Sequence, residues 1–168
     1  MNAPDASGLS QGLNRVENAA IDYVQKEREN ADTAALLDAD RKLNDWKTAT
    51  MFDPKTGVYT RKGQNALDIT NQTLPGYDKH VEEVMGGLGN EQQKARFKVI
   101  AARQREGLSN ELNRYEYGER QNWYDEADKA SLTGAATSAS MYYNRPDQMA
   151  GYLNKGLAVI ESQGQRKG

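Results

Sequence analysis

The sequence predicts an all-α protein, an elongated bundle of long helices that pair like a coiled coil, with one small β-hairpin near residues 51–60. Apolar residues recur at steps of three and four over long stretches, and helix breakers concentrate at the junctions between them. Only 37% of the 168 residues are hydrophobic. A single copy therefore has little apolar area to bury, and we expect the chain to depend on partners.

The first predicted helix runs from about Ser10, its expected N-cap, to Thr48. Its apolar row begins with Leu13, Val16, Ala20, Tyr23 and Val24. A helix of this length spans about 60 Å at 1.5 Å per residue, which is far longer than helices in compact domains. We therefore expect a rod.

This helix is expected to end before Asp53-Pro54-Lys55-Thr56-Gly57, which places Pro and Gly at turn positions. The runs Met51-Phe52 and Val58-Tyr59-Thr60 on either side should pair as the hairpin. A further helical stretch covers residues 64–88. Pro75 within it removes a backbone hydrogen bond, so a kink or a break into two helices is expected there.

The second long helix is predicted from Glu91 to Met141. Its apolar stripe follows the narrow spacing of a coiled-coil seam and comprises Phe97, Ala101, Gln104, Leu108, Leu112 and Tyr115. A last helix starts at Asn144 or Arg145, because Pro146 suits a first helical turn. Its expected buried row is Met149, Leu153, Leu157 and Ile160.

The predicted organisation has three parts. Residues 1–9 form a flexible N-terminus, residues 10–164 form a single extended helical domain, and residues 165–168 form a tail at which a longer chain would continue. The N-terminus lacks the pattern of a signal peptide, and no apolar run approaches the roughly 18 residues of a membrane span.

The composition argues against several kinds of functional site. Lys and Arg together number 22 against 24 Asp and Glu, so any contact with DNA should be local and transient. The chain has no cysteine and a single histidine, His80, which is expected on the surface. Asp38, Asp40 and Asn44 lack the glycine and glutamate of a calcium loop. We therefore expect no catalytic residue, no metal, no cofactor and no small-molecule substrate.

Two features of the 91–141 helix indicate interaction with other chains. Its start is basic, with Lys94, Lys98 and Arg105, whereas the section from Glu106 to Asp128 is mostly acidic. This charge distribution favours staggered or antiparallel pairing of helices. Ordinary solvated charge is an equally open interpretation.

The second feature is an aromatic cluster that follows the apolar stripe. The candidate interaction residues are Leu108, Leu112, Tyr115, Tyr117, Arg120, Trp123 and Tyr124. Tyr, Trp and Arg are enriched at interface hot spots, so Trp123 is the expected anchor and Glu119 a rim charge of small effect. Packing inside the chain is the alternative role for the cluster.

A resemblance to a known family rests on two segments and the long helix that follows them. The segments are Tyr59-Thr60-Arg61-Lys62-Gly63-Gln64-Asn65-Ala66 and Leu88-Gly89-Asn90-Glu91-Gln92-Gln93-Lys94-Ala95-Arg96-Phe97. Over roughly Ala39 to Ile160 the chain resembles the N-terminal regions of internal virion (DNA-ejection) proteins of short-tailed bacteriophages. The residues that carry this resemblance mark helix ends and turns and are not active-site residues. The resemblance implies a protein packaged in the capsid near the portal, which passes into the host envelope and periplasm ahead of the genome.

The expected function is therefore that of a non-enzymatic virion protein, which oligomerises and helps to form a conduit for genome delivery. Its expected partners are further copies of itself and other virion proteins, namely portal, tail or other ejection proteins. One alternative is a head–tail connector or scaffold that stays in the particle. Another is the accessory helical domain of a cell-wall hydrolase.

Overall fold

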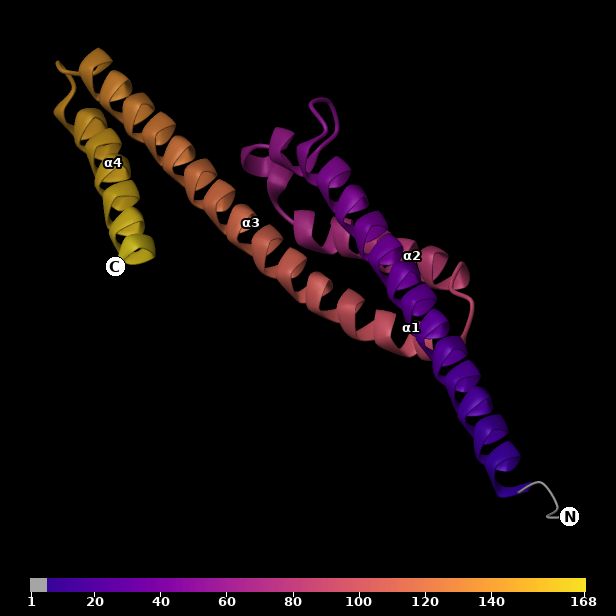
Figure 1. The fold of residues 1–168 in the computed structure, drawn as a ribbon. Helices are drawn as coiled ribbons and strands as arrows, with labels where there is room; N and C mark the ends of the chain where they lie inside the picture. The colour runs from indigo at the N-terminus through magenta and orange to yellow at the C-terminus, as the bar shows by residue number, and fades with distance from the viewer. Residues whose placement is uncertain (1–5) are drawn as a thin grey trace, which may run out of the picture. The chain divides into compact units, whose positions relative to one another are not determined.

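The computed structural model describes residues 6–168, and these residues contain helices and no strand. Figure 1 shows the helices, which follow in the order α1 (Ala6–Phe52), η1 (Val58–Thr60), η2 (Gly63–Ala66), α2 (Ile69–Gly86), α3 (Glu91–Met141) and α4 (Pro146–Lys167). The two η elements are single 3₁₀ turns. The predicted all-α class is confirmed.

The chain divides into two compact units, whereas the sequence predicts one domain over residues 10–164. Unit 1 comprises Met1–Thr48 and Gly76–Glu106, and unit 2 comprises Ala49–Pro75 and Gly107–Gly168. Of the predicted N-terminal segment 1–9, residues 1–5 lie outside the described part and the remainder begins α1. Of the predicted tail, residues 165–167 still belong to α4.

The two C-terminal helices follow the prediction closely. α3 covers Glu91–Met141, and α4 follows the N-cap Arg145 with Pro146 in its first turn. The start of α1 differs, because the helix begins at Ala6 and Ser10 lies within it. Ser10 is therefore not the N-cap.

The predicted hairpin near residues 51–60 is wrong. Met51 and Phe52 are the last residues of α1, and Val58, Tyr59 and Thr60 form η1. The Asp53 carboxylate accepts hydrogen bonds from the backbone N–H groups of Lys55 (2.8 Å) and Thr56 (2.7 Å). These bonds hold the pKa of Asp53 below its usual range. These local hydrogen bonds stabilise a tight turn after α1. The side-chain acceptor of Asp53 thus competes with the extended backbone that a hairpin would need.

Of the kink or break predicted at Pro75, the break does not occur, because α2 runs from Ile69 to Gly86 with Pro75 inside it. Proline lacks only the N–H that would bond the carbonyl of Asn71, so a single hydrogen bond is lost. Residues 64–66, expected to start this helix, belong instead to η2. Asp68, with a φ of 74°, separates η2 from α2.

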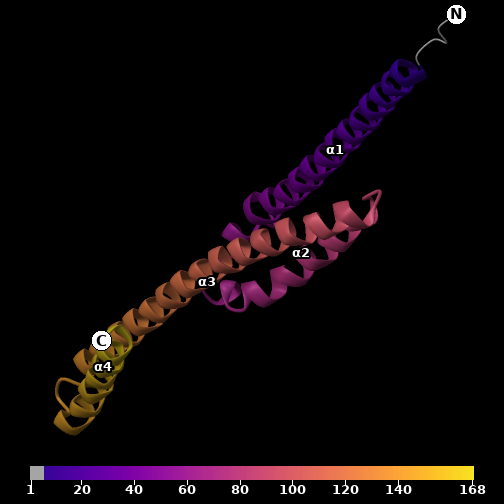
Figure 2. The same cartoon turned by 60° about the horizontal axis from the view of Figure 1, so that its bottom comes forward.

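The core of unit 1 forms where α1, α2 and α3 meet, as Figure 2 shows from a second side. Leu43 and Phe97 are fully buried, as is Tyr77, whose hydroxyl donates to the backbone oxygen of Ala101 (3.0 Å). The Trp46 ring meets the Tyr77 ring edge-on at 5.7 Å. A Cβ at Gly76 would lie 3.2 Å from the Trp46 ring, so glycine permits this close approach.

Polar side chains add to this packing in unit 1. Asp32 on α1 accepts hydrogen bonds from Gln93 (2.7 Å) and Asn90 (3.1 Å), and these bonds lower the pKa of Asp32. Further along α1, Asp40 accepts a hydrogen bond from Gln104 of α3 at 2.5 Å. Each bond joins residues about 60 positions apart in the sequence, so these side chains fix the register of α1 against α3.

His80 is half-buried rather than on the open surface, where the sequence placed it. Its ring stacks on Trp46 with centroids 6.0 Å apart, and its Nε2 lies 3.3 Å from the backbone oxygen of Lys42. The histidine therefore contributes to the packing of α2 on α1.

In unit 2, α4 folds back along the end of α3 (Figure 1). The predicted buried row of α4 is wrong for its three large members, because Leu153, Leu157 and Ile160 are 47%, 56% and 52% exposed. The row that packs is displaced by one residue and comprises Met149, Tyr152, Gly156, Val159 and Gln163. Gly156 is buried, and a Cβ there would lie 3.6 Å from Ala135, an ordinary van der Waals contact, so this face of α4 lies close to α3.

The burial of Tyr77 predicts a response to alkaline pH. Desolvation is the main cause that raises the pKa of Tyr77 to about 12. Since the folded-state pKa exceeds the ordinary value, this group's contribution to stability is complete below pH 10 and is lost as the pH rises towards 12. Absorbance titration of tyrosinate should show one fewer late-ionising tyrosine in Tyr77→Phe than in the parent. An unchanged late fraction would contradict the burial of Tyr77, and Tyr143→Phe, at an exposed position, is the control.

Candidate interaction site

The section of α3 from Leu108 to Tyr124 lies in unit 2, where it packs against the residues between α1 and α2. Leu108 and Leu112 are completely buried together with Met51, Ala66 and Ile69. They form the core of unit 2 and do not belong to its surface. The sequence proposed both leucines for interaction with another chain, whereas the structure packs them inside their own unit.

Tyr115 binds the loop that contains η1. Its hydroxyl lies 2.6 Å from the backbone oxygen of Arg61 and donates to it, and it accepts a hydrogen bond from Lys62 Nζ at 3.0 Å. The Tyr59 ring meets the Tyr115 ring edge-on at 4.9 Å. The Tyr59 hydroxyl donates to Glu111 (2.7 Å), and burial, followed by this bond, raises the pKa of Tyr59 to about 12. Both tyrosines therefore hold the loop against α3.

Glu119 is the main polar anchor of η2, although the sequence placed it at an interface rim. It is 9% exposed and accepts a hydrogen bond from the backbone N–H of Gly63 (2.8 Å). Lys62 Nζ lies 3.4 Å from its other carboxylate oxygen. Gly63 has a φ of 53°, a left-handed conformation that suits glycine. Glu119 therefore has a role inside its unit, which the sequence did not predict, while its effect on assembly relative to Trp123 stays a prediction.

Glu116, one turn earlier on α3, binds the start of α2. Its carboxylate accepts a long hydrogen bond of 3.3 Å from the backbone N–H of Thr70, which is the second residue of α2. It also pairs with Arg120 at 2.6 Å. A carboxylate at a helix N-terminus satisfies a free N–H group and interacts favourably with the helix dipole. Arg120 thus supports an internal contact.

Three aromatic candidates remain further along the same helix. Tyr117 is exposed, whereas Trp123 and Tyr124 are half-buried with their rings 5.1 Å apart. Arg166 of α4 lies over the Tyr124 ring at 5.0 Å. Trp123 lies beside an open hollow of about 650 Å³ that Lys62, Glu119 and Asp125 also line. Of the seven α3 candidates, Tyr117 and Trp123 are the ones left for contact with another chain.

The basic candidates lie in unit 1. Arg105 forms a two-point ion pair with Asp78 of α2 (2.7 and 2.9 Å), which holds the pKa of Asp78 below its usual range. Lys94 pairs with Glu91 at 2.8 Å on the same helix, and Lys98 is exposed. Lys98 therefore stays available for the charge pairing that the sequence predicts, whereas Arg105 is engaged within its own unit.

Two apolar surfaces were missed by sequence reasoning. One is the N-terminal half of α1 and the other is the exposed row Leu153, Leu157 and Ile160 of α4. Periodicity identifies both rows as apolar but does not tell whether another helix of the same chain covers them. For α4 the available signal was Gly156, since a glycine in mid-helix often marks a close helix contact.

In the described residues 6–168 there is no group of three or more acidic or histidine side chains that could hold a metal ion. In that same part of the chain, no helix is both long and apolar enough to cross a lipid bilayer. Comparisons of the chain with protein-family models, with curated proteins and with solved structures find no match.

The Glu119 contact predicts a substitution series. Glu119→Ala leaves the Gly63 N–H without its acceptor and should lower the free energy of unfolding by about 1–3 kcal/mol. Glu119→Gln keeps an acceptor oxygen and should cost less. Glu126→Ala, at an exposed position of the same helix, should stay within about 0.5 kcal/mol of the parent. Denaturant unfolding followed by circular dichroism measures all three, and equal effects of Glu119→Ala and Glu126→Ala would rule out the anchor.

Proposed function

We propose that the chain is a non-enzymatic structural protein of a bacteriophage particle, an ejection or internal core component that associates with copies of itself. Such an assembly would gather near the portal and help to form a conduit for the genome. The resemblance described above supports the phage setting. The observation that carries the assembly function is the exposed apolar row on the first half of α1.

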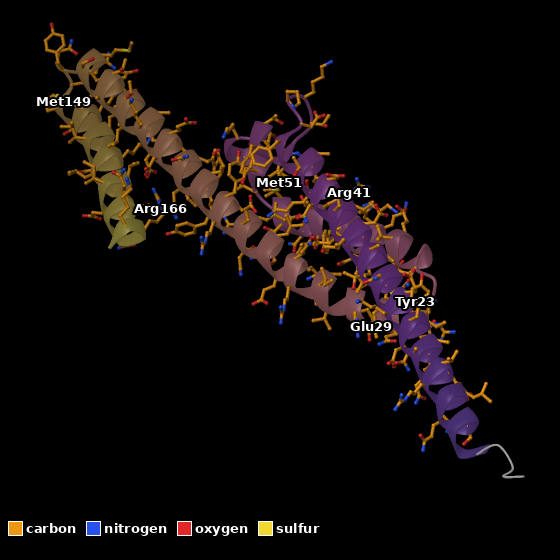
Figure 3. All side chains as sticks on the ribbon, in the orientation of Figure 1. Tyr23, Glu29, Arg41, Met51, Met149 and Arg166 are labelled. Atoms are coloured by element: carbon orange, nitrogen blue, oxygen red, sulfur yellow. The ribbon has the colours of Figure 1, made fainter. Side chains whose placement is uncertain are left out.

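Residues 10–31 of α1 contribute no buried side chain to their unit, although Gln25, Arg28 and Glu29 line an open hollow together with Gln93 and Arg96 of α3. Every residue from Ser10 to Ala31 is exposed. Figures 1 and 2 both show it extending past the loop that joins α2 to α3, and Figure 3 labels Tyr23 on it. The side chains of Leu13, Val16 and Tyr23 are 69%, 69% and 67% exposed. A helix with an uncovered apolar row is marginal in water, so a partner would stabilise it.

The exposed row is a different face from the one that α1 packs inside unit 1. The packed face contains Asp32, Leu36, Ala39, Leu43 and Trp46. Continued towards the N-terminus at the same steps, it carries the polar residues Asn14, Asn18 and Gln25 and one apolar residue, Ile21. The apolar row through Leu13 and Val16 is rotated from it by about a third of a turn. The apolar row is therefore not a continuation of the face that α1 buries in the core of unit 1.

The spacing and charges of this segment favour pairing of α1 with α1 of another copy. Leu13, Val16, Ala20 and Tyr23 follow steps of three, four and three, which suit coiled-coil pairing. In a parallel pair in register, Glu27 at the end of the row would face Glu27 of the other copy. In an antiparallel pair in which Leu13 of one copy faces Tyr23 of the other, the two Glu27 side chains lie at opposite ends of the pair, which favours that orientation.

The resemblance also supplies the proposed partners and location. Portal, tail or other ejection proteins would surround the assembly inside the capsid, and the host envelope and periplasm would receive it on infection. Tyr117 and Trp123 on α3, and Lys98, offer further contact points for these proteins. Nothing in this proposal requires a substrate, a cofactor or a metal.

A matched pair of substitutions tests the α1 surface. Val16→Asp places a charge in the apolar row, whereas Asn18→Asp places the same residue on the polar face of the same helical segment. We expect Val16→Asp to shift the oligomer towards smaller species and Asn18→Asp to leave it unchanged, because only the first buries a carboxylate. Sedimentation velocity over a concentration series measures both. Equal behaviour of the two variants would exclude the α1 row as an interface.

The phage role is tested on particles. If the protein is an ejection component, it should be present in purified virions and absent from the empty particles that remain after triggered DNA release. Quantitative protein analysis before and after release measures this, with the major capsid protein as the retained control. Full retention in emptied particles would replace the proposal with the connector or scaffold alternative.

A further inference from the structure

Helix α1 has two parts that differ in what stabilises them. Residues 32–48, the inner segment, pack on other helices of unit 1: Asp32 accepts a hydrogen bond from Gln93 of α3 (2.7 Å), and Leu43 is fully buried. Residues 10–31, the outer segment, are exposed throughout. Figure 3 labels Tyr23 and Glu29 on the outer segment and Arg41 on the inner one. The tertiary support of α1 therefore stops within one turn of the helix.

The outer segment makes almost no contact that would hold it as a helix. Over residues 11–31 the structure shows no ion pair, and the side-chain hydrogen bond there comes from Thr33 to the backbone oxygen of Glu29 within the same helix (2.8 Å). Gln25 and Arg28 border a hollow beside α3 and remain exposed. The helix therefore depends here on its own backbone hydrogen bonds and on the helix propensity of its residues.

These residues form a weak helix. Glycine, asparagine, aspartate, tyrosine and β-branched residues have low helix propensity, and nine of the 21 residues from 11 to 31 are of these kinds, namely Gly12, Asn14, Val16, Asn18, Ile21, Asp22, Tyr23, Val24 and Asn30. Only Asp22 precedes a basic residue, Lys26, at the favourable spacing of four.

The inner segment offers the outer one a helix end from which to grow. Growth removes the cost of nucleation, but each added residue must still favour the helix by itself. It has to pass Asn30 and then the run from Ile21 to Val24, all four of whose residues have low helix propensity. Helix that grows from the inner segment should therefore fray before it reaches Leu13 and Val16.

We propose that the outer segment is mostly unfolded in the free chain and becomes helical when its apolar row is covered, so that its folding and the association of chains are one step. The row of Leu13, Val16, Ala20 and Tyr23 exists only on a helix, because 3.6 residues per turn bring these steps of three and four to one face. An unfolded segment presents the same side chains separately. The free chain then has no continuous apolar surface at this end.

This inference rests on the proposed function for the partner, which is the outer segment of a second copy, and it adds how that pairing is controlled. A segment that folds on binding loses part of its binding free energy to ordering, so the pair is weaker than a pair of preformed helices. Association then requires a high local concentration of chains. The inner segment stays folded in both states, because unit 1 holds it.

Hydrogen exchange followed by mass spectrometry tests the coupling on the full chain. At a concentration at which sedimentation shows a monomer, we expect the amides of residues 11–31 to exchange within seconds and those of residues 36–46, in the same helix, to stay protected. At a concentration at which the parent associates, residues 11–31 should become protected. Val16→Asp should abolish this gain, and Asn18→Asp, on the polar face, should retain it.

Helix propensity at one position separates coupled folding from the pairing of preformed helices. Asn18→Ala and Asn18→Gly differ in propensity and leave the apolar row intact. We expect Asn18→Gly to self-associate about fivefold or more weakly than Asn18→Ala, because propensity affects the dissociation constant only if the helix forms on association. Ala34→Gly, at an exposed position of the inner segment, should leave the constant unchanged, since packing holds the helix there before and after association.

The contrary outcomes separate this inference from the proposed function. Protection of residues 11–31 in the dilute monomer, or equal dissociation constants for Asn18→Ala and Asn18→Gly, overturns the coupled step while self-association stands. Association of the parent without new protection in residues 11–31 also overturns it, because the interface then lies elsewhere. A parent that stays monomeric at every concentration overturns the proposed self-association and the coupled step together.

Discussion

The buried stripe of α3 is the constraint on which both units depend. Phe97 and Ala101 supply the core of unit 1, and Leu108 and Leu112 supply the core of unit 2. The spacing of these residues at steps of three and four is possible only on a continuous helix, so helix formation and core formation require one another. Because hydrophobic residues are scarce in this chain, each unit has few other side chains of this size to bury.

Scarce apolar area also explains why long-range polar contacts are prominent. Asp32 with Gln93, Asp40 with Gln104, and Glu119 with the Gly63 N–H each join segments far apart in the sequence. A buried donor or acceptor that loses its partner costs more than the bond itself contributes. Such contacts therefore exclude wrong registers of one helix on another, which an alanine-rich helix surface would tolerate.

The sequence was sufficient to predict the bounds of a helix where a regular apolar pattern ends at helix-breaking residues. Glu91–Met141 and the Pro146 start of α4 were predicted because Gly-rich or Pro-containing junctions bound a regular apolar pattern. It was insufficient at residues 51–60, where Val58, Tyr59 and Thr60 have high strand propensity but the Asp53 carboxylate and contacts with α3 favour a 3₁₀ turn. It was also insufficient for Glu119, since the partner of a charged side chain depends on which loop the fold brings near it.

The α4 row shows the limit of periodicity most clearly. Two rows one residue apart, Leu153–Leu157–Ile160 and Tyr152–Gly156–Val159, both satisfy a helical spacing, and hydrophobicity alone selects the first. The fold uses the second, in which Gly156 is buried and lies close to Ala135 and Leu132 of α3, and hydrophobicity does not predict this choice.

Leu153, Leu157 and Ile160 of α4 and the apolar row of the first half of α1 are therefore exposed, while the inner contact of α4 includes Tyr152, Gly156 and Val159. In a chain of low hydrophobic content, such a distribution contributes less to the folding free energy of an isolated copy than full burial would, since these side chains are about half exposed or more. It becomes favourable when these rows are buried between chains. The two units bury large side chains of their own, among them Tyr77, Phe97 and Leu108, so the exposed rows of α1 and α4 are the exceptions that the proposed assembly would explain.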